Sequence, residues 1–379
     1  MFTDSTKVAI GLLIECFSPV SDPRMVRCQK HKLIDILIIA LCSVIAGGQG
    51  PTEMEAFGQA KIEWLGQFLE LPHGIPSHDT FGRVLSLIAP GEFQHCLLKW
   101  VSSNVKLGVG DVIPIDGKTL RRSHNKANEQ DAVEIVSAWA ASQRLTLGQV
   151  KVAEGSNEIA AVPQVLDLVS IEGATVTIDA IHCQKATVAK VREKKADYVV
   201  ALKKNQKQQY EAVKEYLTSV REDRTHGFAV STYQTIEKDH GRIETRKYWQ
   251  ADAPDFLPEK ELWRDLKSVG LVEATREING KTSTEVRYYL SSLPVQARHF
   301  GQAVRTHWAI ENSCHWVLDV VFGEDDCRIR MGNAAENLST LRRLAMNLLR
   351  REKSDKRGVQ VKRLRAALDE NYLLKVLRS

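Results

Sequence analysis

Three acidic residues have the types and spacing of a metal site. Asp116 follows the apolar run VIPI and Asp179 follows TVTI, so each carboxylate comes at the end of a predicted strand. In open α/β sheets, ligands and catalytic groups gather at the carboxyl ends of strands. Two carboxylates there repel each other unless a cation lies between them. Glu311, on the predicted helix AVRTHWAIENSCHWVLDVVF, offers a third carboxylate.

Such a triad indicates phosphoryl transfer. Carboxylate oxygens suit Mg²⁺, with Mn²⁺ as a substitute. Two such ions about 3.5–4 Å apart activate the attacking hydroxyl or water and stabilise the leaving oxygen. Asp116, on the central strand, is the expected bridging ligand between Asp179 and Glu311. The alternative is that each acid is an ordinary capping or turn residue, because Asp is common in both places.

The same helix allows a zinc interpretation. His307, Glu311, His315 and Asp319 recur every four residues and share one face, as helix-borne zinc ligands do. The outer two lie about 18 Å apart at 1.5 Å per residue, so all four cannot bind one ion, and the sequence has no HExxH motif. The pattern therefore favours histidines that flank the acid or contact DNA.

The elements expected around these residues form an α/β protein. Residues 1–105 have helical periodicity, and residues 51–88 outline two helices joined by a turn, as in a DNA-binding module or an ordinary helix pair. From residue 111, the order strand, hairpin, helix, strand, helix, strand predicts a mixed sheet. Four β-rich runs follow between residues 221 and 293, with Asn279-Gly280 as a hairpin turn. Helices return from residue 295.

Composition excludes several classes of protein. The chain has 379 residues, 43% hydrophobic and 26% charged, which is unlike a disordered, collagenous or disulfide-scaffold chain. The formal net charge is +5, but residues 327–379 carry 14 Lys and Arg against 5 Asp and Glu. This basic tract predicts a polyanion partner or, alternatively, a solvated helical face.

The cysteines and the longest apolar run bear on the compartment. Seven scattered cysteines with no CxxC pair predict reduced thiols and a cytoplasmic protein. The longest apolar run, residues 33–46, is interrupted by Asp35 and is too short to span a bilayer comfortably. We therefore expect no membrane partner.

The sequence resembles the ISAs-type insertion-sequence transposases, also called H-repeat-associated proteins, of the DDE transposase superfamily. Matching stretches cover almost the whole chain in order, among them IPIDGKTLRRS, VTIDAIHCQK, DHGRIETRKYW and HWAIENSCHWVLDVVFGEDDCRIRMGNAAENL. The resemblance implies an RNase H-like mixed-sheet catalytic core with a β-rich insertion, preceded by an all-α N-terminal domain. It places Asp116, Asp179 and Glu311 at the three acidic positions.

The resulting domain prediction has five segments. Residues 1–110 form a helical domain that is a candidate for DNA binding, and residues 111–220 form the first part of the core. The β-rich insertion spans 221–294, the core helices with Glu311 span 295–350, and a basic helix spans 351–379.

The activity that the resemblance implies is Mg²⁺-dependent cleavage of DNA at the element ends, followed by strand transfer into target DNA. The partners would be double-stranded DNA, as terminal inverted repeats and as target. A homodimer is expected because two ends must be paired, and nucleoid association follows from DNA binding. Two alternatives stay open: an H-repeat-associated DNA-binding protein that no longer transposes, and a metal-dependent nuclease.

The predicted DNA contacts are basic and aromatic residues near the acids or on the insertion. Related transposases carry a Tyr–Arg–Glu–Lys signature, whose Tyr, Arg and Lys positions fall here on Val304, His307 and Leu318, so the transfer of those roles to His307 and the nearby Arg305 is an expectation. For the residues beside Asp116, solvated charges are the alternative, and for Trp249 a place in the sheet core. The full set is Lys118, Arg121, Arg122, Lys203, His240, Arg242, Trp249, Arg305 and His307.

Overall fold

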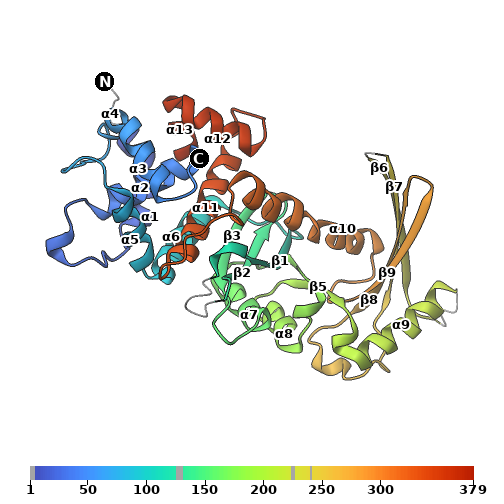
Figure 1. Cartoon of the computed structure of the whole chain (residues 1–379). Coiled ribbons are helices and arrows are strands. Elements are labelled where there is room, and N and C mark those ends of the chain that lie inside the picture. The colour runs from blue at the N-terminus through green and yellow to red at the C-terminus, as the bar shows by residue number, and fades with distance from the viewer. Residues whose placement is uncertain (1–4, 125–130, 223–226, 240) are drawn as a thin grey trace.

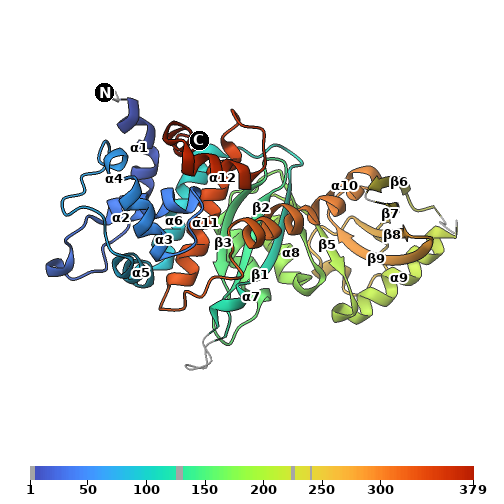
Figure 2. The same ribbon diagram turned by 45° about the horizontal axis from the view of Figure 1, so that its top comes forward.

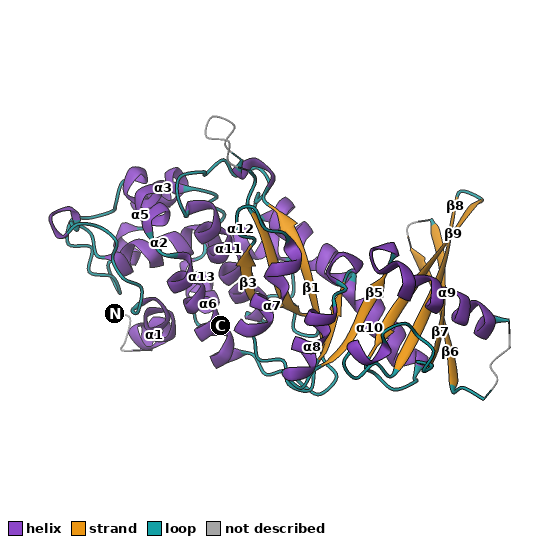
Figure 3. Ribbon diagram, turned by 90° about the horizontal axis from the view of Figure 1, so that it is seen from below, coloured by secondary structure: helices purple, strands orange, loops and turns teal. Residues whose placement is uncertain are grey.

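The computed structural model describes residues 5–124, 131–222, 227–239 and 241–379. The molecule is elongated (Figure 1). A body of helices that includes both termini lies at one end, a sheet with helices on both faces lies in the middle, and long strands form the other end. Figure 3 shows the same division, with helices gathered at one end and strands at the other.

The helical end begins with the predicted N-terminal helices. These are α1 (Ser5–Phe17), α2 (Leu33–Ile45), α3 (Pro51–Ala60), α4 (Ile62–Leu65), α5 (His78–Leu87) and α6 (Pro90–Asn104). The apolar helix α2 lies at the centre and is buried from Asp35 to Ile45. The first of the two helices predicted within residues 51–88 is interrupted, because the backbone leaves helical geometry at Lys61, where φ is −118°.

The last helices pack onto the first ones. Helices α11 (Ala334–Arg351), α12 (Val359–Leu368) and α13 (Glu370–Leu377) share one apolar core with α1 and α2. Arg343 is buried and lies 3.1 Å from Glu324, and Arg363 donates to the carbonyl of Val44 at 2.9 Å. Much of the basic tract therefore holds helices together.

The core sheet has the topology expected of an RNase H-like domain, so the predicted fold class is confirmed. Its strands are β1 (Val112–Thr119), β2 (Glu134–Ala140), β3 (Leu145–Lys151), β4 (Thr175–Ile178) and β5 (Asp197–Leu202), in the order β3-β2-β1-β4-β5. β2 is antiparallel to β1 and β3, whereas β1, β4 and β5 are parallel.

Helices cover both faces of this core (Figure 2). Alternate residues of β4 show which helices lie where, because successive side chains point to opposite faces. Val176 and Ile178 pack in the core that contains α7 (Glu158–Leu168) and α8 (Lys185–Glu193). Thr177 faces the other side, towards His307 at the end of α10 (Ala297–His307). α10 thus brings the Glu311 segment to the face opposite α7 and α8.

The β-rich insertion extends the core sheet. After α9 (Lys207–Arg221), strands β6 (Val230–Asp239), β7 (Arg242–Asp252), β8 (Ser268–Ile278) and β9 (Lys281–Ser291) pair antiparallel in sequence order, and β9 pairs with β5. The described residues thus form one nine-stranded sheet. At the β8–β9 turn, Asn279 and Gly280 have φ of 51° and 73°, as a type I′ hairpin requires.

Candidate active site

Two neighbouring parallel strands bring Asp116 and Asp179 together. β1 and β4 pair in register from Val112↔Thr175 to Ile115↔Ile178, so the two aspartates are the next residues on adjacent strands. β1 does not end at Asp116, as the sequence suggested, but continues to Thr119 paired with β2 alone. The chain after Asp179 leaves the sheet in a 3₁₀ turn, so the strands separate at the two acids.

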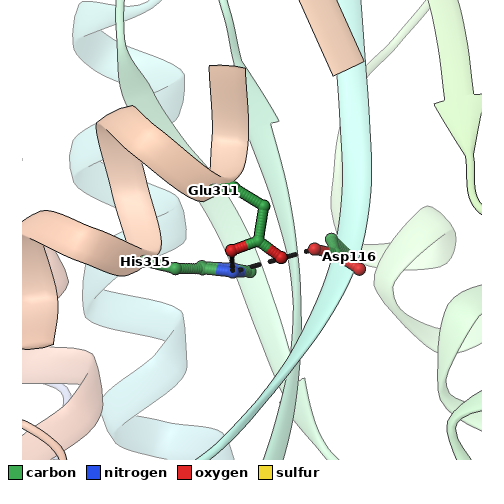
Figure 4. Close-up of side chains that lie close together, drawn as sticks. All are labelled: Asp116, Glu311 and His315. Atoms are coloured by element: carbon green, nitrogen blue, oxygen red, sulfur yellow. Dashed lines mark ion pairs between the residues drawn. The ribbon is translucent and has the colours of Figure 1, made fainter. Parts of the chain in front are cut away.

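Glu311 reaches the same place from the helix that follows α10. The helix widens to π-helical geometry over Glu311–His315 and again over Val317–Val321, and such turns occur frequently at functional sites. Glu311 and His315 both point towards Asp116 on β1 (Figure 4). The Nδ1 atom of His315 lies 3.7 Å from Asp116 Oδ2 and 3.7 Å from Glu311 Oε2.

All three acids line one pocket of about 220 Å³, together with Lys203 and His307. The structure thus gathers the predicted triad and two of the predicted DNA contacts. Residues of β9 also line the pocket. Among them, Arg287 has its guanidinium 4.4 Å above the ring of Trp308.

The electrostatics of the pocket favour a bound cation. The pKa of Asp116 is raised from 3.8 to about 6, chiefly by burial, and the carboxylates of Glu311 and Asp179 act in the same direction whereas His315 opposes them. The neighbouring imidazole of His315 lowers the pKa of Glu311. Burial lowers the pKa of His307 to about 4, so this side chain is neutral near pH 7. Gathering several ionised acids in a partly buried pocket is costly without a compensating positive charge.

The donor atoms fit a divalent metal. One ligand atom each from Asp116, Glu311 and His315 lies within 4.8 Å of the other two, and Asp179 lines the same pocket. His315 is 5% exposed, and its Nε2 atom has no hydrogen-bond partner among the described residues. Carboxylate oxygens suit Mg²⁺ and Mn²⁺, and imidazole nitrogen also suits transition metals.

A second cluster of polar residues, formed by His182, Glu158 and Glu134, lies next to Gly117, and the sequence did not predict it. His182 is fully buried, and its Nε2 lies 3.1 Å from Glu158 Oε2. This contact lowers the pKa of Glu158, and hydrogen bonding to Glu158 raises the pKa of Glu134. The Glu158 carboxylate packs against Gly117, the residue after Asp116. No motif joins residues so far apart in sequence, whereas the four-residue spacing of Glu311 and His315 was visible.

The basic residues after Asp116 differ in their surroundings. Lys118 is buried, and its ammonium lies 2.6 Å from Asp319 and 2.7 Å from Asp325. These ion pairs tie β1 to the π-helical turn that contains Asp319 and to the segment after it, and a DNA phosphate would have to displace a carboxylate to reach the ammonium group of Lys118. Arg121 and Arg122 are exposed and lie 3.1 Å from Asp325 and 3.3 Å from Asp326.

Three further candidates, Arg242 and Trp249 on the insertion and Arg305 on α10, do not line the pocket. Arg305 lies 3.0 Å from Glu237 and Arg242 lies 3.6 Å from Glu244. Trp249 is partly buried and packs against the sheet core. His240 lies outside the described residues.

Comparison with known proteins identifies the family. Residues 108–348 match the model of the family described as Transposase DDE domain, and residues 14–101 match the one described as DDE_Tnp_1-associated. The chain belongs to the DDE transposase family. The predicted resemblance is therefore confirmed. Within the described residues, no helix of this transposase-family chain has the length and apolar character needed to cross a membrane.

Two relatives that match over most of both chains carry transposase names. The H repeat-associated putative transposase YhhI of Escherichia coli strain K12 is 39% identical over 96% of this chain and 97% of its own. The putative transposase YncI of Escherichia coli O157:H7 is 39% identical over 98% of this chain and 96% of its own. A piggyBac transposase in a synaptic complex with hairpin DNA superposes with a TM-score of 0.47 at 11% identity, over 97% of this chain and 80% of that one.

Proposed function

We propose that this chain cuts DNA at the ends of a mobile element and joins the resulting 3′ ends to target DNA, using two Mg²⁺ ions. Asp116, Asp179 and Glu311 are the proposed metal ligands and catalytic residues. The observation that carries the proposal is their convergence in one pocket, in a chain whose residues 108–348 match the transposase DDE domain.

The chain's own residues have distinct proposed roles there. Asp116 would hold metal together with the other two acids, because it neighbours Asp179 on the adjacent strand and because the Nδ1 atom of His315 lies 3.7 Å from the carboxylates of both Asp116 and Glu311. His315 orients both carboxylates from its buried position. His307, neutral and 3.0 Å from the hydroxyl of Thr177, adds no charge to the site. When bound, the metal ions would activate the attacking hydroxyl and stabilise the leaving oxygen.

We propose Lys203, His307 and the exposed Arg121 and Arg122 as contacts to DNA near the scissile phosphate, because phosphates are bound chiefly by Arg, Lys and polar side chains. Reaction at two element ends at once calls for a homodimer in the DNA complex. We propose the cytoplasm, at the nucleoid, as the place of action, since all seven cysteines are free thiols.

The test uses duplex DNA that carries the element's own terminal inverted repeats, with Mg²⁺ and a target plasmid. Asp116→Asn, Asp179→Asn and Glu311→Gln should each lower cleavage by roughly 10³-fold or more, a loss of about 4 kcal/mol of transition-state stabilisation. The matched control is Glu172→Gln, an exposed acid paired with Lys195, which should cut at the parent rate. If all three variants cut as well as the parent, the site assignment is wrong.

The same assay separates the alternatives. Cleaved ends that are never joined to the plasmid indicate a nuclease. Specific binding to the repeats without cleavage in Mg²⁺ or Mn²⁺ indicates a DNA-binding protein that no longer transposes.

A further inference from the structure

A second hollow lies next to the active-site pocket, on the side of the helical body. Its cavity is about 680 Å³, and three segments line it: the β2–β3 turn, the π-helical turn after Glu311, and the loop between α11 and α12. Glu311 lines the pocket, and the next two residues, Asn312 and Ser313, line this groove. The two hollows therefore share one turn of helix.

The groove is strongly cationic. Its lining contains one acid, Asp355, and that carboxylate is already neutralised by Arg357 at 2.6 Å and Arg365 at 3.2 Å. The basic lining residues come from the β2–β3 turn and from the α11–α12 loop with the two helices beside it. They are Arg144, Arg350, Lys353, Lys356, Arg357 and Lys362.

Three of these cations are exposed and have no carboxylate partner among the described residues. Arg144, Lys353 and Lys356 are exposed, and none forms an ion pair with any described residue, unlike Arg357. The inner cations have structural roles instead. Arg350 donates to the carbonyl of Arg144 at 2.6 Å, and the buried Lys362 donates to that of Leu349 at 2.8 Å. Arg350 and Lys362 are thus held by hydrogen bonds within the protein, whereas the three exposed cations are available to a ligand.

The loop that carries two of these charges is held in place. Glu352 is 5% exposed, and its carboxylate accepts hydrogen bonds from the backbone of Ser354 at 2.6 Å and from the hydroxyl of Tyr372 at 2.8 Å. Lys353 and Lys356 therefore project from an anchored loop, which lowers the entropy lost when they bind a ligand.

An aromatic side chain accompanies the charges. Trp316 lines the groove and is 54% exposed, although a residue of its size is usually buried. Aromatic rings interleaved with cations are typical of surfaces that bind nucleic acid, because bases and sugars pack on the ring while phosphates meet the cations. We propose that this groove binds the sugar-phosphate backbone of the DNA that runs from the active-site pocket, through Arg144, Lys353 and Lys356. The proposal rests on the proposed function for its ligand.

The test measures binding, so that it does not depend on catalysis. The triple variant Arg144→Ala/Lys353→Ala/Lys356→Ala of the full chain is titrated against a short fluorescein-labelled duplex of arbitrary sequence, by anisotropy between about 50 and 200 mM salt. Each lost phosphate contact should reduce the slope of log affinity against log salt by about 0.9, so the triple variant should lose between about 2 and 3. Affinity at low salt should fall on the order of tenfold or more, alike for different sequences.

The matched control removes exposed lysines that already have acidic partners. Lys195→Ala/Lys214→Ala breaks pairs with Glu172 and Glu211 and should leave the slope at the parent value. Because all substituted side chains are exposed, the thermal midpoints of both variants should match the parent, which shows that any lost binding is not lost folding.

The outcomes separate this groove from the active site. An unchanged slope and affinity in the triple variant would overturn the proposal that this groove binds DNA, even if the acid variants abolish cleavage. A reduced slope would support DNA binding by the groove, even if the acid variants still cut and the proposed function fails.

Discussion

At the scale of single residues, the central feature is a carboxylate whose environment opposes its charge. Asp116 lines a pocket together with two further acids, and its pKa is raised from 3.8 to about 6, chiefly by burial. A bound cation reverses this penalty because it favours the ionised form. Proton and metal therefore compete for the same side chain.

This competition predicts how stability depends on pH. The folded state binds the Asp116 proton more tightly than the unfolded state does, so without metal the contribution of this group to stability is greatest below pH 3.8. It falls by roughly 2–3 kcal/mol as the pH rises to 6. Stabilisation by Mg²⁺ should grow over the same range. Thermal melts with and without Mg²⁺ between pH 4 and 8 measure both effects. Asp116→Asn should show neither, and a variant that responds as the parent does would show that another group titrates.

Lys118 provides a second test at this scale. Its ammonium lies 2.6 Å from Asp319 and 2.7 Å from Asp325 and is buried. Lys118→Met removes the cation and leaves these acids unpaired, which should lower the free energy of unfolding by about 3–5 kcal/mol. Chemical denaturation measures this loss. Arg121→Ala, at an exposed position beside the same Asp325, should cost less than about 1 kcal/mol. Equal effects of the two variants would contradict the structural role given to Lys118.

At the scale of elements, the site depends on where β1 and β4 separate and on the wider turn of the glutamate helix. The meeting of Asp116 and Asp179 could be predicted, because VIPID and TVTID each read as a strand followed by an acid, but the continuation of β1 to Thr119 could not. The π-helical turn could not, since an α-helix and a π-helix share the same apolar periodicity over a few residues. The ion pairs of Lys118 could not be predicted from the sequence either, because its partners follow about two hundred residues later and only tertiary packing brings them near.

The contact between Gly117 of β1 and Glu158 of α7 lies next to Asp116, and its importance can be tested. A Cβ atom at Gly117 would lie 2.6 Å from Cδ of Glu158, so Gly117→Ala should push Glu158 away from His182. We expect a loss of about 1–3 kcal/mol in unfolding free energy and slower cleavage, because Asp116 is the adjacent residue. Denaturant melts and the cleavage assay measure these effects. Gly91→Ala in α6, where a Cβ meets nothing within 4 Å, is the control. Parent-like stability and cleavage in Gly117→Ala would show that the contact is dispensable.

At the scale of the whole molecule, two long-range arrangements were not predictable. The sequence indicated the β-rich insertion and its Asn279-Gly280 turn, but the pairing of β9 with β5 depends on how distant strands meet. The basic C-terminal tract suggested a polyanion-binding segment, whereas the structure buries Arg342, Arg343 and Arg363 in the helical body. Arginine counts alone do not distinguish buried guanidinium groups from exposed ones.

Two nearby leucines test whether the last helix belongs to that body. Leu373 in α13 is fully buried, whereas Leu368 at the end of α12 is 76% exposed. Leu373→Ala should lower the free energy of unfolding by about 2–5 kcal/mol through the cavity that it leaves, and Leu368→Ala should change it by less than about 0.5 kcal/mol. Thermal and denaturant melts of the two variants measure these changes in the free energy of unfolding. Comparable small effects for both would mean that α13 is not part of the folded core.

The most direct measurement of the central claim is the joining of a labelled element end to a target plasmid, in Mg²⁺, by the parent and by Asp116→Asn. The parent should form joined product that disappears when the metal is chelated. The variant should fold and bind the same DNA yet form joined product at least roughly 10³-fold more slowly. Joining by Asp116→Asn at the parent rate would contradict the assignment of this pocket as the catalytic site.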